Sequence, residues 1–168
     1  MKTIRSAPAT AACPSAIAPA RAHYALPAFN NKVITMKSDD ASLIYSTFLG
    51  GSHLDYGTDI AVDNWGRVFV AGGTESNDFP VRCGSTKAPS WDGFITVLEW
   101  GGSDILFSTH LGGDSIDQIN AIAVDSSGAA HVTGSTYSWG FPFLNGFQPT
   151  PAGSGDAFVS TVTPVKCE

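Results

Sequence analysis

Three tryptophans in turn-like segments are the residues of this sequence best suited to holding a ligand. Trp65, Trp91 and Trp139 each stand among Gly, Ser, Asp or Asn residues. Exposed indole rings stack on the apolar face of a sugar ring while nearby polar groups hold its hydroxyls. A lectin-like glycan site at these residues is therefore one functional hypothesis. Against it, the tryptophans do not recur at equivalent positions of the internal repeat described below.

Calcium binding is a second chemistry that aspartates in this sequence suggest. The carboxylates concerned are Asp55, Asp59, Asp63, Asp117 and Asp125. They lack the D-x-[DN]-x-[DN]-G spacing of an EF-hand loop. Asp63 and Asp125 each begin a D-x-x-G segment, in which the Asp side chain accepts backbone N–H groups of a tight turn. We expect turn caps here and no cofactor, with calcium as the alternative.

The remaining reactive residues show no catalytic or metal-binding spacing. The histidines are His23, His53, His110 and His131, and the cysteines are Cys13, Cys83 and Cys167. No C-x-x-C pair, G-x-S-x-G elbow or phosphate-binding glycine motif occurs. We predict a non-enzymatic protein in which His110 and His131 fill space within strands. One disulfide with a free thiol and no disulfide at all both remain open.

Composition excludes several classes of protein. The 168 residues include 18 Gly and 10 Pro, only 14% are charged, and the formal net charge is −6. Nucleic-acid binders cluster Lys and Arg, so that class is disfavoured. No apolar run reaches the ~18 residues that a membrane-spanning helix needs. A turn-rich β protein is predicted.

Residues 1–32 differ from the rest and form a separate leader rich in Ala and Pro. The basic start Met1–Arg5 and the small-x-small segment Ala20–Ala22 are typical of a secretory signal, although three prolines interrupt its apolar core. A cleaved signal and an irregular leader are both open, and secretion or surface display is the expected localisation.

An internal repeat organises residues 33–168. A shift of 62 residues aligns Leu43–Pro80 with Ile105–Pro142 without a gap, and 17 of the 38 positions are identical. The copies diverge after their shared Phe-Pro and rejoin at Asp92 and Asp156. The two repeats therefore span about 43–104 and 105–168.

Each copy alternates short strand-like segments with turns. The expected strands of the first copy are Leu43–Leu49, Asp59–Val62, Arg67–Ala71 and Phe94–Glu99, and Ile105–Leu111 follows. Turn residues recur at Gly50, Gly51, Asp63 and Gly66, and again at Gly112, Gly113, Asp125 and Gly128. Four strands per unit in tandem, without a helical pattern, predict antiparallel β-propeller blades. A β-sandwich is the competing fold.

The repeated motifs resemble a known family. Leu-Gly-Gly ends at Gly51 and Gly113, Ile-Ala-Val-Asp ends at Asp63 and Asp125, and Phe-Pro ends at Pro80. These motifs are similar to the bacterial SBBP repeat, found in seven-bladed β-propellers, over about residues 33 to 162. The resemblance implies a scaffold of secreted or surface proteins and carries over no catalytic residue.

The strand count predicts an incomplete ring. Asp59–Leu111 makes one whole blade, Ile119–Val162 makes three strands of a second, and Leu43–Leu49 is an outer strand preceded by a remnant at Val33–Met36. Open strand edges invite pairing. We expect self-association or the remainder of a longer propeller chain, with Leu43–Leu49 pairing at the Val162 end. The predicted function is a scaffold in assembly, adhesion or protein interaction.

Overall fold

A computed structural model describes residues 32–36, 43–86 and 90–166, and in these residues it contains nine β-strands and no helix. The strands are β1 (Lys32–Met36), β2 (Leu43–Phe48), β3 (Asp55–Val62), β4 (Val68–Thr74), β5 (Asp92–Leu98), β6 (Ile105–Leu111), β7 (Asp117–Val124), β8 (Ala130–Thr136) and β9 (Asp156–Val162). No helix in this part of the chain is long and apolar enough to cross a membrane.

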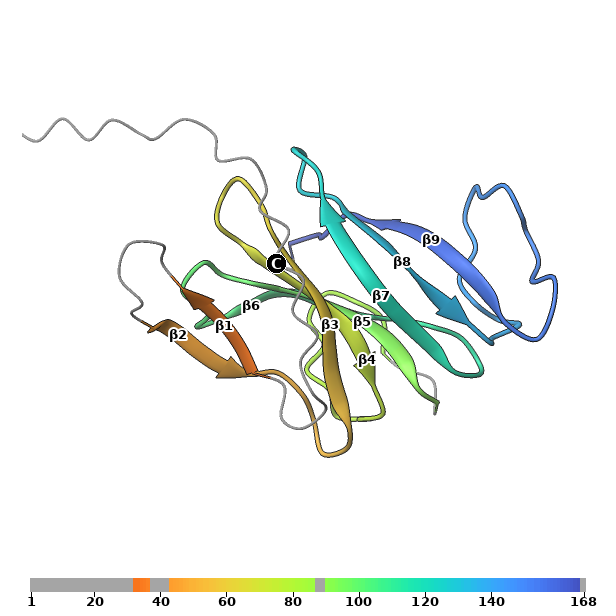
Figure 1. Ribbon diagram of the computed structural model, residues 1–168, viewed down its shortest axis with the longest axis horizontal. Helices are drawn as coiled ribbons and strands as arrows, with labels where there is room; N and C mark the ends of the chain where they lie inside the picture. The colour runs from red at the N-terminus through yellow and green to blue at the C-terminus, as the bar shows by residue number, and fades with distance from the viewer. Residues whose placement is uncertain (1–31, 37–42, 87–89, 167–168) are drawn as a thin grey trace, which may run out of the picture.

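The strands form three antiparallel sheets that follow one another along the molecule (Figure 1). We call β3-β4-β5-β6 blade 1, the three-stranded sheet β7-β8-β9 blade 2, and the pair β1-β2 the half-blade. Each strand in a sheet pairs antiparallel with its neighbour in sequence, across short turns and also across the long loops that join β4 to β5 and β8 to β9. The all-β blade architecture and the incomplete ring are therefore confirmed.

Strand bounds differ from those expected at the inner strand. β3 begins at Asp55, four residues before the expected Asp59, because its ladder with β4 continues past a register shift between Gly57 and Asp59. Blade 2 shows the same shift between Ile119 and Ala121. Glycine and polar residues before the irregularity hide the strand from a period-two pattern. The strand expected at Ile105–Leu111 is observed with the same bounds as β6.

The half-blade is the outer half of a blade. β1 pairs with β2 with a register shift between Thr35 and Met36, and β5 pairs with β6 with a shift between Val97 and Leu98. These positions are 62 residues apart, which is the repeat offset. β1 is therefore the third strand, and β2 the fourth, of a blade whose inner strands are not among those described.

Two apolar cores lie between the sheets. One unites Phe69, Ile95 and Val97 of blade 1 with Ile119 and other residues of blade 2. The second covers the opposite face of blade 1, where Val70 and Phe94 pack with Leu49 before β3. Blade 1 is buried on both faces, so every residue of β4 and β5 is buried. Low charge in the sequence is explained by this arrangement.

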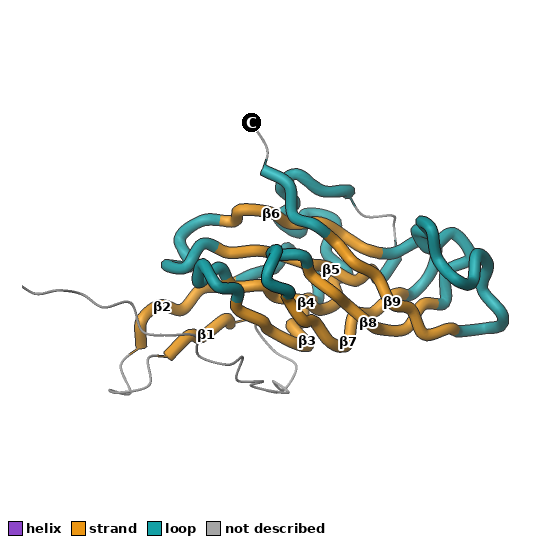
Figure 2. The backbone as a smooth tube through the Cα atoms, turned by 90° about the horizontal axis from the view of Figure 1, so that it is seen from above, coloured by secondary structure: helices purple, strands orange, loops and turns teal. Residues whose placement is uncertain are grey.

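The two open ends of the molecule are far from each other. β2 lies at one end of the molecule and β9 at the other (Figure 1), and the view from above shows the same order of sheets (Figure 2). β2 pairs with β1, and β9 pairs with β8. The expected pairing of Leu43–Leu49 with the Val162 end is therefore not formed within one chain, because blade 1 stands between them.

Candidate functional site

The turn between the second and third strand segments of each copy is built around one aspartate. Asp63 Oδ1 accepts the backbone N–H groups of Trp65 and Arg67, both at 2.9 Å. Asp125 Oδ1 accepts those of Ser127 and Ala129, at 2.8 and 3.0 Å. The fourth residues, Gly66 and Gly128, have φ of 77° and 83°, a region that favours glycine. These carboxylates are structural acceptors.

The Gly-Gly pairs lie over a second repeated aspartate. Asp55 Oδ2 accepts the Gly51 N–H and the Ser76 hydroxyl, both at 2.8 Å, and Asp55 Oδ1 accepts the Thr74 hydroxyl. In blade 2, Asp117 Oδ2 accepts the Gly113 N–H and the Ser138 hydroxyl, both at 2.7 Å. A side chain at Gly50 would lie 2.7 Å from the Asp55 carboxylate. This network ties the start of each blade to the end of its second strand.

Sequence reasoning missed this network, although a signal existed. The Thr-x-Ser of Thr74–Ser76 recurs as Thr136–Ser138 at the repeat offset. Identical polar residues at equivalent buried positions indicate a repeated hydrogen-bond role. The second copy is less complete, because Asp117 Oδ1 is buried without a hydrogen-bond partner in the described part of the chain.

The three candidate tryptophans do not form one site. Trp65 and Trp139 are 61% and 72% exposed. Trp91 is half-buried and packs on Tyr56 with ring centroids 5.2 Å apart, and burial raises the pKa of Tyr56. Trp65 lines a groove with Arg67, whose guanidinium lies 5.1 Å from the indole centroid. Neither Trp91 nor Trp139 lines this groove, so only Trp65 is part of it.

The histidines have different surroundings. His110 is 7% exposed and meets Phe79 edge-on at 5.6 Å, as a filler of aromatic size does. His131 is exposed, with Nε2 3.1 Å from Asp125 Oδ2 and Nδ1 3.0 Å from the Thr161 hydroxyl. The interpretation of His131 as a space-filling residue is therefore not met, because no sheet among the described residues covers this face of β8. His53 bonds to the adjacent Ser52 hydroxyl at 3.0 Å.

The face of blade 1 that packs on blade 2 and the equivalent face of blade 2, which we call the outer faces, differ in polarity and in exposure. In blade 1, Phe69 and Val97 are fully buried against blade 2. The equivalent positions in blade 2 carry His131 and Thr161, both exposed. Ala71 and Ile95 are likewise buried, and their equivalents Thr133 and Val159 are exposed, Val159 by 83%. The buried face of blade 1 is therefore apolar, and most of the equivalent residues on the exposed face of blade 2 are polar.

Aromatic side chains mark the join between the third and fourth strands. In blade 1, Phe79 and Phe94 lie 4.5 Å apart, and His110 of β6 completes a group of three rings. In blade 2, Phe141 and Phe158 repeat the pair at 4.5 Å. Because β9 has no fourth strand beside it among the described residues, the third ring position is open.

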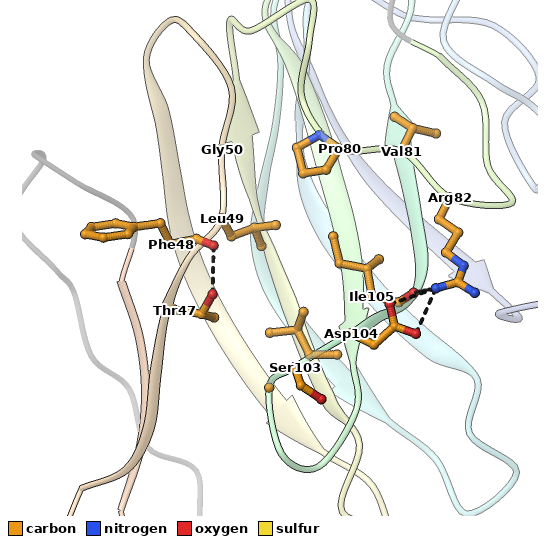
Figure 3. Close-up of a pocket in the computed structure, with 12 residues that line it drawn as sticks. Thr47, Phe48, Leu49, Gly50, Pro80, Val81, Arg82, Ser103, Asp104 and Ile105 are labelled. Atoms are coloured by element: carbon orange, nitrogen blue, oxygen red, sulfur yellow. Dashed lines mark hydrogen bonds and ion pairs between the residues drawn. The ribbon is translucent and has the colours of Figure 1, made fainter.

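A groove between the half-blade and blade 1 has a volume of about 430 Å³ (Figure 3). Arg82 donates from Nη1 to both oxygens of Asp104, each at 2.9 Å, and to the Ile105 carbonyl at 2.6 Å. The Phe48 ring points away from Leu49 and Ile105 (Figure 3). Phe48 is 76% exposed. The groove presents no group of titratable residues positioned for catalysis.

Several sequence predictions concern residues outside those described or sites that the structure does not assemble. His23, Cys13, Cys167 and residues 1–31 of the predicted leader lie outside the described residues, whereas Lys32, the last residue of that leader, begins β1. Cys83 is disulfide-bonded. Within the described ranges, no group of three His, Cys, Asp or Glu residues is placed to hold a metal ion.

Comparison with known proteins agrees with the blade geometry. A family model described as the SBBP β-propeller repeat matches residues 44–80 and 106–142. Each match runs from the fourth strand of one blade through the first two strands of the next and ends at the Phe-Pro. No curated protein matches the chain. The matched segments, the strand order and the repeated turns agree: two segments of this chain match the SBBP β-propeller repeat.

Proposed function

We propose that this protein is a non-enzymatic scaffold, secreted or displayed on a bacterial surface, that acts by binding another protein strand at the open edge of β9. A β-propeller repeat supports a role in protein interaction. An exposed strand edge presents unpaired N–H and C=O groups to a partner strand. The partner we propose is β2 of a second copy of the chain, so that the function is assembly.

The observation that carries the proposal is the open ring position beside Phe141 and Phe158. In blade 1 this position is taken by His110 of β6. The residue of β2 at the repeat-equivalent position is Phe48, which is largely exposed in its own chain. β2 pairs with β1 through the edge and in the register that β6 uses with β5, so the exchange of β2 onto β9 of another copy displaces β1 from β2. In the same register on β9, Phe48 of the second copy stands opposite Phe158.

The outer face of blade 2 suits a reversible contact of this kind. Its polar groups are already bonded within the blade: the Thr133 hydroxyl donates to the Phe158 carbonyl at 2.8 Å, and the Thr161 hydroxyl bonds to His131. Polar groups with partners can be buried at little cost or left in water. An interface of mixed polarity is typical of proteins that associate and separate.

Sedimentation measures this association directly. The wild-type chain should sediment at more than the mass of one chain, with a concentration dependence. Phe48→Ser should return it to one chain, because the ring that fills the open position is lost. The matched control is Leu144→Ser, which removes an exposed apolar side chain from the β8–β9 loop. A wild-type mass of one chain with a sharp, cooperative melt contradicts the proposal.

Secretion has a separate test. The basic start of the chain and the Ala20–Ala22 segment support it. Expression in a bacterial host followed by N-terminal sequencing of the protein from the medium should show a start after Ala22. A start at Met1 in the cytoplasmic fraction alone contradicts secretion.

A further inference from the structure

The Lys and Arg side chains of residues 43–86 and 90–166 line one groove. In residues 43–86 and 90–166 the sequence has three Lys or Arg residues, Arg67, Arg82 and Lys166, against a formal excess of Asp and Glu. All three line a groove of about 580 Å³. No Asp or Glu is among its lining residues. Arg67 and Arg82 are each paired with a carboxylate outside the lining, Asp63 and Asp104, so the net positive charge of the groove comes from Lys166.

One wall of the groove is the turn between β3 and β4. The buried Asp63 carboxylate holds the Arg67 side chain through Nε at 2.5 Å, and it also fixes the backbone of Trp65. Arg67 then lies over the Trp65 indole. The geometry leaves both Nη groups of Arg67 for other acceptors, because Asp63 engages only Nε among the bonds seen.

The equivalent turn of blade 2 closes the same wall. A side chain at Gly128 would lie 2.5 Å from Arg67 Nη2 and 3.3 Å from the Trp65 ring. Ser127 beside it lines the groove, and its hydroxyl donates to Asp125 Oδ1 at 2.6 Å. Trp65 and Arg67 are thus held between two packed blades, which gives the site a defined shape in the absence of a ligand.

The rest of the lining is apolar or positive. Val97, Leu106 and Phe107 are apolar lining residues, and Phe107 is buried. Arg82 also lines the groove and pairs with Asp104 through Nη1. Lys166 lines it as well. An apolar lining with an exposed indole and cations suits a ligand with a flat apolar face and a carboxylate.

We propose that this groove binds a glycan that carries carboxylate groups, of the uronic-acid class. One sugar ring stacks on Trp65, and its carboxylate bonds to Arg67 and Lys166. A neutral glycan would use neither the charge of Lys166 nor the Nη groups of Arg67 as partners for a carboxylate. A nucleic acid needs a larger basic surface than this acidic protein offers. The proposal does not depend on association at β9, because the groove uses neither β9 strand residues nor β2.

Calorimetric titration with trigalacturonic acid tests the site, with its fully methyl-esterified form as the uncharged match. We expect the acid to bind and the ester to bind at least about tenfold more weakly. Added salt should weaken the binding of the acid, because it screens the attraction between opposite charges. Trp65→Ala and Lys166→Glu should each weaken binding by about tenfold or more. Trp139→Ala is the matched control, because it removes an exposed indole outside the groove, and it should leave binding unchanged.

A second arm separates glycan recognition from simple charge attraction. Triglutamate carries the same number of side-chain carboxylates without a sugar ring, and we expect it to bind more weakly than the sugar acid. Four results would each overturn the proposal: no binding of trigalacturonic acid, equal binding of its ester, equal binding of triglutamate, or equal losses from Trp65→Ala and Trp139→Ala. Far-ultraviolet spectra of all variants confirm that the sheets are intact.

Discussion

Asp59 of blade 1 accepts the backbone N–H of Ile122 in blade 2 at 3.0 Å, and this bond joins the innermost strands of two neighbouring blades. Its other oxygen accepts the N–H of Ile60 at 2.9 Å. The Thr58 hydroxyl adds a bond to the Ile119 carbonyl at 2.7 Å. Blade 2 carries Asn120 and Ala121 at the two equivalent positions. The polar join between blades is therefore built once in the described chain.

Substitution of Asp59 should weaken the contact between blades. Asp59→Ala leaves two backbone N–H groups without their acceptor, and we expect the free energy of unfolding to fall by about 1–3 kcal/mol. Asp59→Asn keeps one acceptor oxygen and should lose less. Urea denaturation of both variants measures the difference. Equal stability of the Ala variant and the wild type would show that water replaces the bond without loss.

Exchange of residues between the two outer faces should have unequal effects. Phe69→His places an imidazole in a fully buried position, and we expect a loss of about 2–4 kcal/mol. His131→Phe changes an exposed position, so the stability of the chain should move by less than about 1 kcal/mol. The comparison uses urea denaturation at neutral pH. Similar losses in both variants contradict the assignment of blade 1 as the covered blade.

Gly128 should tolerate no side chain, in contrast with a nearby loop glycine. Its φ is 83°, and an added Cβ would press on Arg67. Gly128→Ala should lower the free energy of unfolding by at least about 1 kcal/mol. Gly101→Ala is the control, because a Cβ there meets nothing within 4 Å. Equal melting temperatures of the two variants would contradict the close approach of the Gly128 turn of blade 2 to Arg67 of blade 1.

Asp125 should make the stability of blade 2 depend on pH in the acid range. The Ser127 hydroxyl, followed by the Ala129 N–H and His131, holds the pKa of this carboxyl well below its usual value. A group whose pKa is lowered on folding stabilises the protein above its unfolded pKa, near 4, and loses that effect as the pH falls. Melting temperatures between pH 2 and 6 should therefore fall toward low pH, and less steeply in Asp125→Asn.

Asp78 provides an internal comparison for the acid range. Its pKa is also lowered, chiefly by the backbone N–H and the hydroxyl of Ser52. Asp78→Asn should remove its own part of the pH dependence and leave the part due to Asp125. If both single variants keep the full wild-type slope, the acid sensitivity arises from other carboxylates.

The sequence predicts the blades well because their strands and turns repeat. Identical residues such as Asp63 and Asp125 occupy identical turns, so one copy supports the interpretation of the other. What differs between copies is harder to foresee. His131 and Phe69 are aligned in sequence, yet one is exposed and the other buried, because burial depends on whether another blade follows. A single sequence carries no direct signal of that neighbour.

The groove lined by Trp65 could also be predicted only in part from the sequence. Trp65 is prominent in the sequence as an aromatic residue in a turn, and its placement beside Arg67 follows from the turn itself. Arg82 and Lys166 are far from it along the chain, and only the packing of two blades brings them together. Trp91 and Trp139 have equally suggestive neighbours in sequence and do not join the site.

Photo-crosslinking from position 48 tests the proposed assembly most directly. A photoreactive benzoylphenylalanine in place of Phe48 keeps an aromatic ring where the open position beside Phe141 and Phe158 would receive it. Irradiation of the assembly that carries this residue should give covalent dimers, with the attachment mapped by mass spectrometry to the segments around Phe141 and Phe158 of the second copy. Irradiation that gives no dimer, or dimers attached elsewhere, contradicts strand addition at β9.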